Sequence, residues 1–425
     1  MPPLPRYLLP KNASVDERGR LAIAGVDLLE LARDHGTPLF VYDEDHLRAQ
    51  CRAAVEAWGD GVAYASKAFL CKAMARLAYE EGMHIDVSTG GELYVARAAG
   101  VPGSRLVLHG NNKSEAELAY ALDEGVGRII VDSFDELRRL ADLKRPARVL
   151  LRVTPGVEAH THEYVMTGHE DTKFGFSISS GAAAEAVARA RDIAHVDLVG
   201  IHAHIGSQIF LLASFVKEVE ALAGFLRDIG VDQLEELCLG GGLGVPYVEG
   251  EAAPTIDEWA ETVRKACANV GVPSHLRLTA EPGRAIVAAA AITLYTVGTI
   301  KDLPGIRTYV AVDGGMSDNP RPVLYGSGYE AFLPRATDAD RPRRATVVGK
   351  HCESGDQIVR DAALPEDVAV GDVLATPVTG AYGHSMASNY NKVPRPAVLF
   401  VRDGDARIVV RRETYDDLVR LDADL

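Results

Sequence analysis

The sequence predicts an α/β protein: a (β/α)8 TIM barrel joined to a C-terminal β-domain, a sandwich or barrel of strands. Its 425 residues are too many for one ordinary hydrophobic core, so two domains are expected. Between residues 43 and 289, eight short apolar runs alternate with longer helical stretches, and after residue 290 the long helical stretches stop. The count of eight favours a closed barrel over an open doubly wound sheet, because such a barrel takes about 250 residues.

The N-terminal residues 1–42 hold short apolar runs separated by glycine and proline, among them 21–24 and Pro38–Tyr42. Runs of this kind are typical of strands. We expect them to join the β-domain that follows the barrel.

The barrel segment alternates strand and helix candidates. The strands are expected at residues 62–66, 84–88, 106–109, 128–131, 149–153, 198–205, 237–240 and 276–280. The helices, rich in alanine, leucine and glutamate, are expected at residues 71–81, 91–99, 113–124, 134–143, 181–193, 214–229 and 256–269.

The last part of the chain is strand-like, with glycine and proline between the runs. Its strands are expected at residues 292–300, 307–312, 344–348, 373–376, 397–401 and 406–411. The predicted organisation is therefore N-terminal strands over residues 1–42, a cofactor-binding barrel over 43–289 and a β-domain over 290–425.

Composition and charge restrict the partners. A net charge of −15 argues against nucleic acid or an anionic membrane as a general partner. The five cysteines are scattered and form no Cys-x-x-Cys pair, which predicts neither a disulfide framework nor a structural zinc site. The first residues lack the apolar core of a signal peptide, and no run of about 18 apolar residues occurs. We expect a reduced, cytoplasmic protein.

Lys67 follows the first barrel strand, where TIM barrels carry their chemistry. An ammonium group is costly to bury at the end of an apolar strand, so the amine must find a counter-charge, lose its proton or form a covalent bond. A desolvated lysine condenses with aldehydes. The alternative is a lysine that extends from the strand end into solvent.

Glycines follow the seventh strand at residues 240–242. Such a run lets backbone N–H groups approach an anion, and barrels often bind phosphate near strands seven and eight. Ser207, after the sixth strand, offers a hydroxyl, and Gly283 with Arg284 offers further donors. The sequence therefore predicts a phosphate site, although a glycine run can also be a simple tight turn.

His202 and His204 are two residues apart on the sixth strand, so both are expected on one side. One imidazole is expected to lie against an aromatic cofactor ring. The alternative is zinc, with further ligands from the loop 158–171 at His160, His162 and His169. We predict no metal, because in a metal-binding barrel the first His-x-His would belong to the first strand, which here carries lysine.

Glu281 follows the eighth strand. It could pair with Arg284, or it could hold the nitrogen of a bound pyridine ring protonated and so make that ring an electron sink. A lysine for an aldehyde, glycines for a phosphate and a glutamate for a ring nitrogen together predict pyridoxal 5'-phosphate as the cofactor.

Five stretches give the chain a clear resemblance: 64–68, 204–208, 281–284, 321–325 and 352–356. With them, the chain resembles the diaminopimelate decarboxylases, of the alanine-racemase-like class of pyridoxal phosphate enzymes. The likeness runs from Gly36 to Tyr390 and implies a TIM barrel with a C-terminal β-domain.

The resemblance also implies roles. Lys67 would carry the cofactor covalently, His204 would stack on its ring and Glu281 would meet the ring nitrogen. The remaining cofactor residues would be Ser207, Gly241, Gly242, Gly283, Arg284 and Tyr382. The substrate residues would be Arg284, Arg321, Tyr325, Glu353 and Tyr382, with the two arginines at the distal carboxylate.

Two residues of the β-domain have an ordinary alternative. Cys352 is a candidate proton donor beside Glu353, although most such cysteines are buried thiols. Arg321, between two prolines, could aim its guanidinium at a carboxylate or be a solvated loop arginine.

Family members are homodimers in which the Cys352–Glu353 segment completes the active site of the partner.

The expected reaction is removal of CO2 from meso-2,6-diaminopimelate to give L-lysine. One alternative is another basic or carrier-bound amino-acid decarboxylase of the same fold. A second is a non-catalytic regulator, which would be expected to have lost its lysine or phosphate donors.

Overall fold

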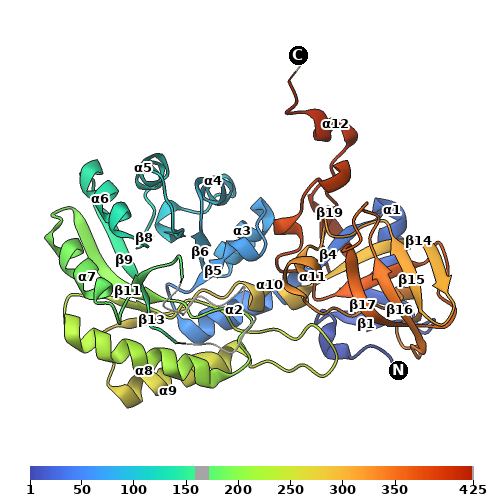
Figure 1. Cartoon of the computed structure of the whole chain (residues 1–425), viewed down its shortest axis with the longest axis horizontal. Helices are drawn as coiled ribbons and strands as arrows, with labels where there is room; N and C mark the ends of the chain where they lie inside the picture. The colour runs from blue at the N-terminus through green and yellow to red at the C-terminus, as the bar shows by residue number, and fades with distance from the viewer. Residues whose placement is uncertain (158–171, 424–425) are drawn as a thin grey trace. The chain divides into compact units, whose positions relative to one another are not determined.

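The computed structural model describes residues 1–157 and 172–423, so the predicted loop 158–171 lies outside the described residues. The chain divides into two compact units (Figure 1). The barrel unit comprises Gln50–Gly244 and Ala253–Ala285, and the β unit comprises Met1–Ala49, Val245–Ala252 and Ile286–Leu425. The domain limits after residues 42 and 289 stay a prediction.

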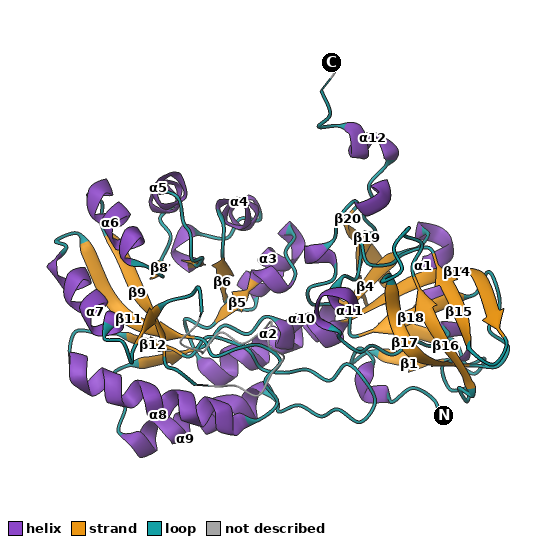
Figure 2. Ribbon diagram, viewed as in Figure 1, coloured by secondary structure: helices purple, strands orange, loops and turns teal. Residues whose placement is uncertain are grey.

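The barrel unit contains, among the described residues, a path of eight parallel strands (Figure 2). Backbone hydrogen bonds join its two ends: Ala63 donates to Ala280 (2.9 Å) and Ala65 to Pro282 (3.2 Å). The predicted TIM barrel is confirmed. The strands are β5 (Ala63–Ala65), β6 (His84–Val87), β7 (Leu106–Leu108), β8 (Arg128–Val131), β9 (Ala147–Thr154), β11 (Val196–Ala203), β12 (Glu236–Cys238) and β13 (Arg277–Thr279).

Helices follow the strands. Several begin where the sequence provides a cap: Ser114 with Glu117, and Thr255 with Glu258, form capping boxes. All seven predicted helices are present within two residues of their expected ends. They are α3 (Lys72–Glu80), α4 (Gly90–Ala98), α5 (Glu115–Asp123), α6 (Phe134–Leu143), α7 (Ala182–Asp192), α8 (Leu212–Ile229) and α9 (Ile256–Val270). The sequence did not predict α2 (Glu44–Trp58), the short α10 (Arg284–Val287) or β10 (Phe176–Ser177), which pairs with β9.

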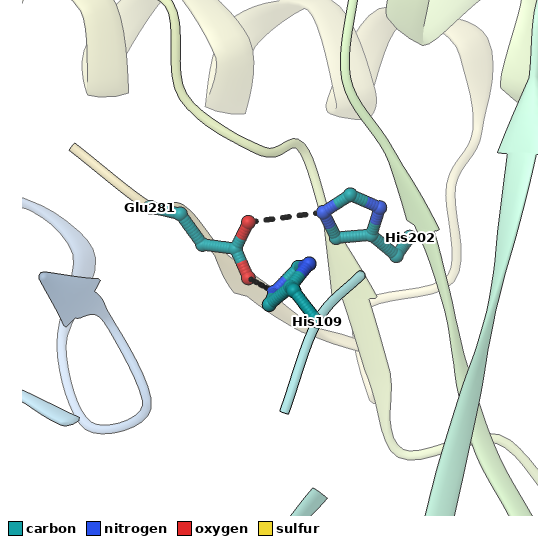
Figure 3. A group of neighbouring side chains, drawn as sticks. All are labelled: His109, His202 and Glu281. Carbon is teal, nitrogen blue, oxygen red and sulfur yellow. Dashed lines mark hydrogen bonds and ion pairs between the residues drawn. The ribbon is translucent and has the colours of Figure 1, made fainter. Parts of the chain in front are cut away.

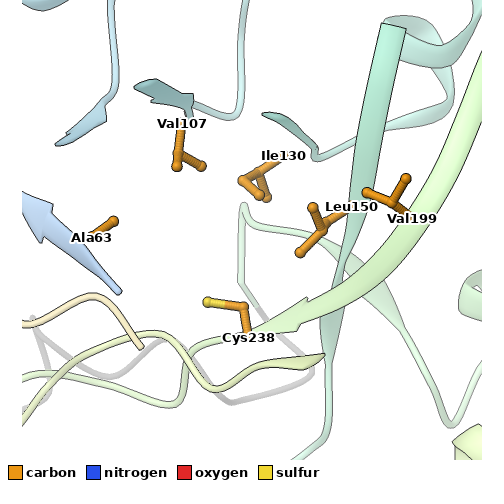
Figure 4. Close-up of a cluster of buried hydrophobic side chains, with 6 residues drawn as sticks. All are labelled: Ala63, Val107, Ile130, Leu150, Val199 and Cys238. Carbon is orange, nitrogen blue, oxygen red and sulfur yellow. The ribbon is translucent and has the colours of Figure 1, made fainter. Parts of the chain in front are cut away.

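The interior of the barrel is filled by side chains (Figure 4). Six strands contribute one buried residue each to this cluster, and Cys238 packs there as a small apolar group whose burial raises the pKa of its thiol. The barrel is thus a packed core and not a pore, which leaves its ends as the places for a ligand. The other members are Ala63, Val107, Ile130, Leu150 and Val199.

The β unit is built on a sheet in the order β17-β16-β15-β14-β4-β19-β20, with β18 beside β14. Residues from the N-terminus contribute an interior strand, because β4 (Leu39–Asp43) pairs with β14 (Ala291–Leu303) and with β19 (Ala397–Arg402). The expectation that N-terminal strands join the β-domain is confirmed. The other strands are β15 (Arg307–Val312), β16 (Arg343–Val348), β17 (Gln357–Leu364), β18 (Val373–Pro377) and β20 (Asp405–Val410).

The remaining elements of the β unit are short. A separate three-stranded sheet contains β1 (Ala13–Val15), β2 (Leu21–Ile23) and β3 (Val26–Asp27). The β unit also contains the helices α1 (Leu28–His35), α11 (Arg321–Tyr325) and α12 (Tyr415–Val419). Among the described residues, none of the helices combines the length and the apolar character needed to cross a bilayer.

Glu218 is a buried carboxyl on α8, and neither of its oxygens has a hydrogen-bond partner in the described part of the chain. Burial raises the pKa of Glu218 well above its usual value. A carboxyl whose pKa is raised by folding contributes stability below its unfolded pKa and loses it as pH rises through the folded pKa. Glu218 therefore destabilises the fold increasingly as the pH increases.

We predict that the unfolding free energy of Glu218→Gln, which lacks the titrating group, increases relative to that of the unmodified protein as the pH rises from 4 to 8. The measurement is urea unfolding at both pH values. The matched control is Glu220→Gln, at an exposed position of the same helix. A difference in unfolding free energy that is the same at pH 4 and pH 8 would contradict the prediction.

Candidate active site

The predicted residues of the barrel unit all follow the carboxyl ends of strands. Lys67 comes after β5, His204 after β11, the glycines 240–242 after β12 and Glu281 after β13. Backbone hydrogen bonds join β5 to the segment around the end of β13. Lys67 and Glu281 therefore follow neighbouring strands at the same end of the barrel.

Lys67 lies in a 3-10 turn (Ser66–Ala68) and not in the strand, which ends at Ala65. It is exposed between two buried neighbours. This exposure fits the alternative in which the lysine extends from the strand end into solvent, and it leaves the covalent role of Lys67 a prediction. Burial raises the pKa of Asp86 to about 6 and also raises the pKa of Glu92, whereas Lys67 lowers both. The amine therefore lies within electrostatic reach of two carboxyls.

The glycine loop lies against the neighbouring loops so closely that side chains are excluded. A Cβ on Gly242, whose φ is +105°, would lie 2.2 Å from the carbonyl oxygen of Gly206. A Cβ on Gly241 would lie 2.3 Å from that of Glu281, and one on Gly283 would lie 2.9 Å from Ala65. Bare backbone from three loops thus gathers at one place, as phosphate binding requires.

Ser207 and Arg284 add polar donors near these loops. The Arg284 guanidinium donates to the Ser207 hydroxyl oxygen at 3.0 Å, joining the loop after β11 to the one after β13. A cationic group and a hydroxyl beside glycine backbone fit a phosphate.

His204 is half-buried, and its Nδ1 accepts a hydrogen bond from the Gly241 amide at 3.1 Å. Burial, with the neighbouring Lys67 charge, lowers the pKa of His204 well below its usual value. The ring is therefore neutral at physiological pH and presents a flat face, which fits stacking on an aromatic ring.

Glu281 is held by two imidazoles (Figure 3). The His109 Nε2 lies 2.7 Å from one carboxylate oxygen and the His202 Nε2 lies 3.0 Å from the other. Burial works to raise the pKa of Glu281, but the two histidines outweigh it and the pKa lies well below its usual value. Glu281 is thus an anion, as a partner for a pyridine nitrogen must be.

Comparison with known proteins agrees with this geometry. Residues 44–288 match the model of the pyridoxal-binding domain of pyridoxal-dependent decarboxylases. The chain is 49% identical to diaminopimelate decarboxylase of Mycobacterium tuberculosis, with 97% of each chain covered, and 47% identical to that of Bacillus subtilis, with 96% of each covered. The chain belongs to the diaminopimelate decarboxylase family. Its cofactor is pyridoxal 5'-phosphate (PLP).

A solved structure supports the fold over the same length. Diaminopimelate decarboxylase of M. jannaschii, in complex with L-lysine, superposes with a TM-score of 0.90 at 33% identity, covering 98% of each chain.

His109 was not given a role by the sequence analysis, and His202 was considered only beside His204. The signal was present, because His109 directly follows the third strand, but its partner is distant in sequence. The ligand atoms of His109, His202 and Glu281 lie within 4.8 Å of one another, which also meets the distance requirement of a metal site. The expectation of no metal stays a prediction, and His160, His162 and His169 lie outside the described residues.

The substrate residues expected in this decarboxylase family lie partly in the β unit. Arg321, in α11, is buried: its guanidinium lies 4.1 Å from the centre of the Tyr247 ring and donates to the Tyr329 hydroxyl. The alternative of a solvated arginine is wrong. Tyr247 was missed because it lies in the segment Val245–Ala252, which belongs to the β unit although barrel residues flank it on both sides.

Cys352 and Glu353 are exposed, so the alternative of a buried thiol is also wrong. Their loop is anchored, since the Cys352 amide donates to the Asn391 side chain (3.0 Å). Tyr325 and Tyr382 are half-buried, and Tyr382 has a left-handed φ of +58°. The part that these residues take in the active site stays a prediction.

We predict that Gly242→Ala displaces the glycine loop and raises the dissociation constant for PLP about tenfold or more, because strain at such a position costs about 1–3 kcal/mol. The measurement is a fluorescence titration of the PLP-free protein. The control is Gly224→Ala on α8, where a Cβ meets only the end of one arginine. Unchanged PLP affinity in the Gly242 variant would contradict the prediction.

Proposed function

We propose that this protein removes CO2 from the D-configured α-carbon of meso-2,6-diaminopimelate and releases L-lysine, the last step of lysine biosynthesis. The observation that carries this is the full-length similarity to diaminopimelate decarboxylases, at 47–49% identity. The site supports it, since the barrel end offers a lysine, a glycine cradle and an anionic glutamate.

Bound PLP supplies an electron sink for the pair left behind when the α-carboxylate departs. Lys67 would hold the cofactor covalently. Its phosphate would be held by Ser207, Gly241, Gly242, Gly283 and Arg284. His204 would stack on its ring, and Tyr382 would contact it.

The distal end of the substrate is the basis of specificity in this proposal. Arg321 is already oriented by two tyrosine rings, so little side-chain freedom is lost when it binds a carboxylate. With Arg284 it receives the distal carboxylate, and Tyr325, Glu353 and Tyr382 complete the substrate site. A diamine-forming enzyme would need acidic groups in place of the arginines.

Protonation of the reacting carbon is assigned to Cys352, whose thiol is exposed, or to a group near it. We propose a homodimer in which the Cys352–Glu353 segment of one subunit completes the active site of the other. A cytoplasmic location is supported by the free cysteines at all five positions.

Carbon dioxide release tests the function. We predict that kcat/KM for meso-diaminopimelate exceeds that for ornithine and for lysine by about 100-fold or more, because a buried guanidinium left without its carboxylate is costly. Lys67→Ala serves as the inactive control and should release no CO2. A preference for ornithine would overturn the proposed substrate.

The role of Arg321 is tested by Arg321→Met, which keeps an unbranched apolar stem and removes the guanidinium with its charge. A hydrogen bond to a charged group contributes about 1.5–3 kcal/mol, so KM for diaminopimelate should rise about tenfold or more. Arg344→Met, at an exposed position in β16, is the control and should leave KM unchanged. An unchanged KM in the Arg321 variant would place the distal carboxylate elsewhere.

A further inference from the structure

The carboxylate of Glu281 is hydrogen-bonded by two histidines that lie on or directly after two other strands of the barrel. His109 directly follows β7, His202 lies on β11 and Glu281 follows β13. All three side chains are buried, and the two rings meet edge to face with their centres 5.0 Å apart (Figure 3). Neither histidine has a role in the proposed reaction so far.

The direction of the two hydrogen bonds follows from the chemistry of the groups. An ionised carboxylate can only accept, so both Nε2 atoms donate. Both rings therefore carry a proton on Nε2. The Nδ1 of His202 is buried without a hydrogen-bond partner in the described part of the chain.

Two hydrogen bonds, one to each oxygen, fix the orientation of the carboxylate without using all of its acceptor sites. The carboxylate has about four acceptor sites, and the histidines use one on each oxygen. Capacity for a further donor remains. The charge is also felt by its neighbours: burial is the main cause of the raised pKa of Asp86, and the Glu281 anion adds to it.

We propose that His109 and His202 are positioning residues, a two-imidazole clamp that fixes the Glu281 carboxylate and leaves its negative charge free to hold a proton on the ring nitrogen of PLP. This inference rests on the proposed function, since it assumes PLP at this end of the barrel. The clamp acts on the cofactor through Glu281, because both Nε2 atoms are occupied by its oxygens.

Substitution by asparagine or glutamine separates the hydrogen bond from the rest of the side chain. The amide of asparagine corresponds to the Nδ1 position and falls short of Glu281, whereas the longer glutamine places its amide near the Nε2 position. His109→Asn and His202→Asn thus remove the clamp, and His109→Gln and His202→Gln retain it. His195→Asn is the matched control, because that ring bonds the Leu140 carbonyl within the same unit.

The readout is the 15N NMR shift of PLP labelled at the ring nitrogen, in the loaded protein at pH 7.5. The unmodified protein should show a protonated nitrogen. The Asn variants should shift toward the unprotonated value and lose about tenfold in kcat with little change in KM. The Gln variants should recover most of the shift and the rate, and His195→Asn should change neither.

The clamp is refuted if the nitrogen stays protonated in both Asn variants, or if the Gln and Asn variants behave alike. In either case CO2 release by the unmodified protein would leave the proposed function intact. Failure of the unmodified protein to bind PLP or to release CO2 would instead refute the proposed function. If one of the two Asn variants folds poorly, the other Asn variant decides the same question. Its dissociation constant for PLP is then compared with that of the Gln variant at the same position.

Discussion

The closure of the barrel is the constraint on which the site depends. Two backbone hydrogen bonds, Ala63 to Ala280 and Ala65 to Pro282, join chain segments more than 200 residues apart. They place the turn of Lys67 beside the loop of Glu281 and Gly283, where a Cβ on Gly283 would collide with Ala65. Lys67 and Glu281 thus come to the same barrel end through main-chain geometry, which side-chain substitution does not easily disturb.

At this end of the barrel, burial and hydrogen-bond partners determine the pKa values of the carboxyl groups. Two buried carboxyls lie near the same barrel end, and their environments push their pKa values apart: that of Glu281 lies well below its usual value and that of Asp86 is raised to about 6. The difference comes from the donors each one has. Glu281 accepts from two imidazoles, whereas one oxygen of Asp86 has no hydrogen-bond partner in the described chain and lies 3.8 Å from the His109 Nε2. Such separation of paired acids is typical of sites with distinct proton roles.

The sequence was most informative about periodic helices and strands. It was least informative about which residues from distant parts of the chain come together in the fold. All eight barrel strands follow from apolar runs, and the glycines and Glu281 follow from their places at the strand ends. The sequence left open whether Lys67 is buried or exposed, because a 3-10 turn after the strand leaves no periodic signal. His109 and Tyr247 were missed for another reason: each acquires its role from a partner distant in sequence. The strand β17 (Gln357–Leu364) was missed because polar residues interrupt its apolar run, whereas α2 does carry apolar residues at helical spacing, Leu47, Cys51, Ala54 and Trp58, so its signal was present.

The central claim is that Lys67, at the mouth of this barrel, bonds covalently to PLP. Reduction of the purified protein with borohydride, followed by peptide mass spectrometry, tests it most directly. The account predicts a phosphopyridoxyl group on the peptide that contains Lys67. Its absence from that peptide, or its presence only on another lysine, would contradict the account.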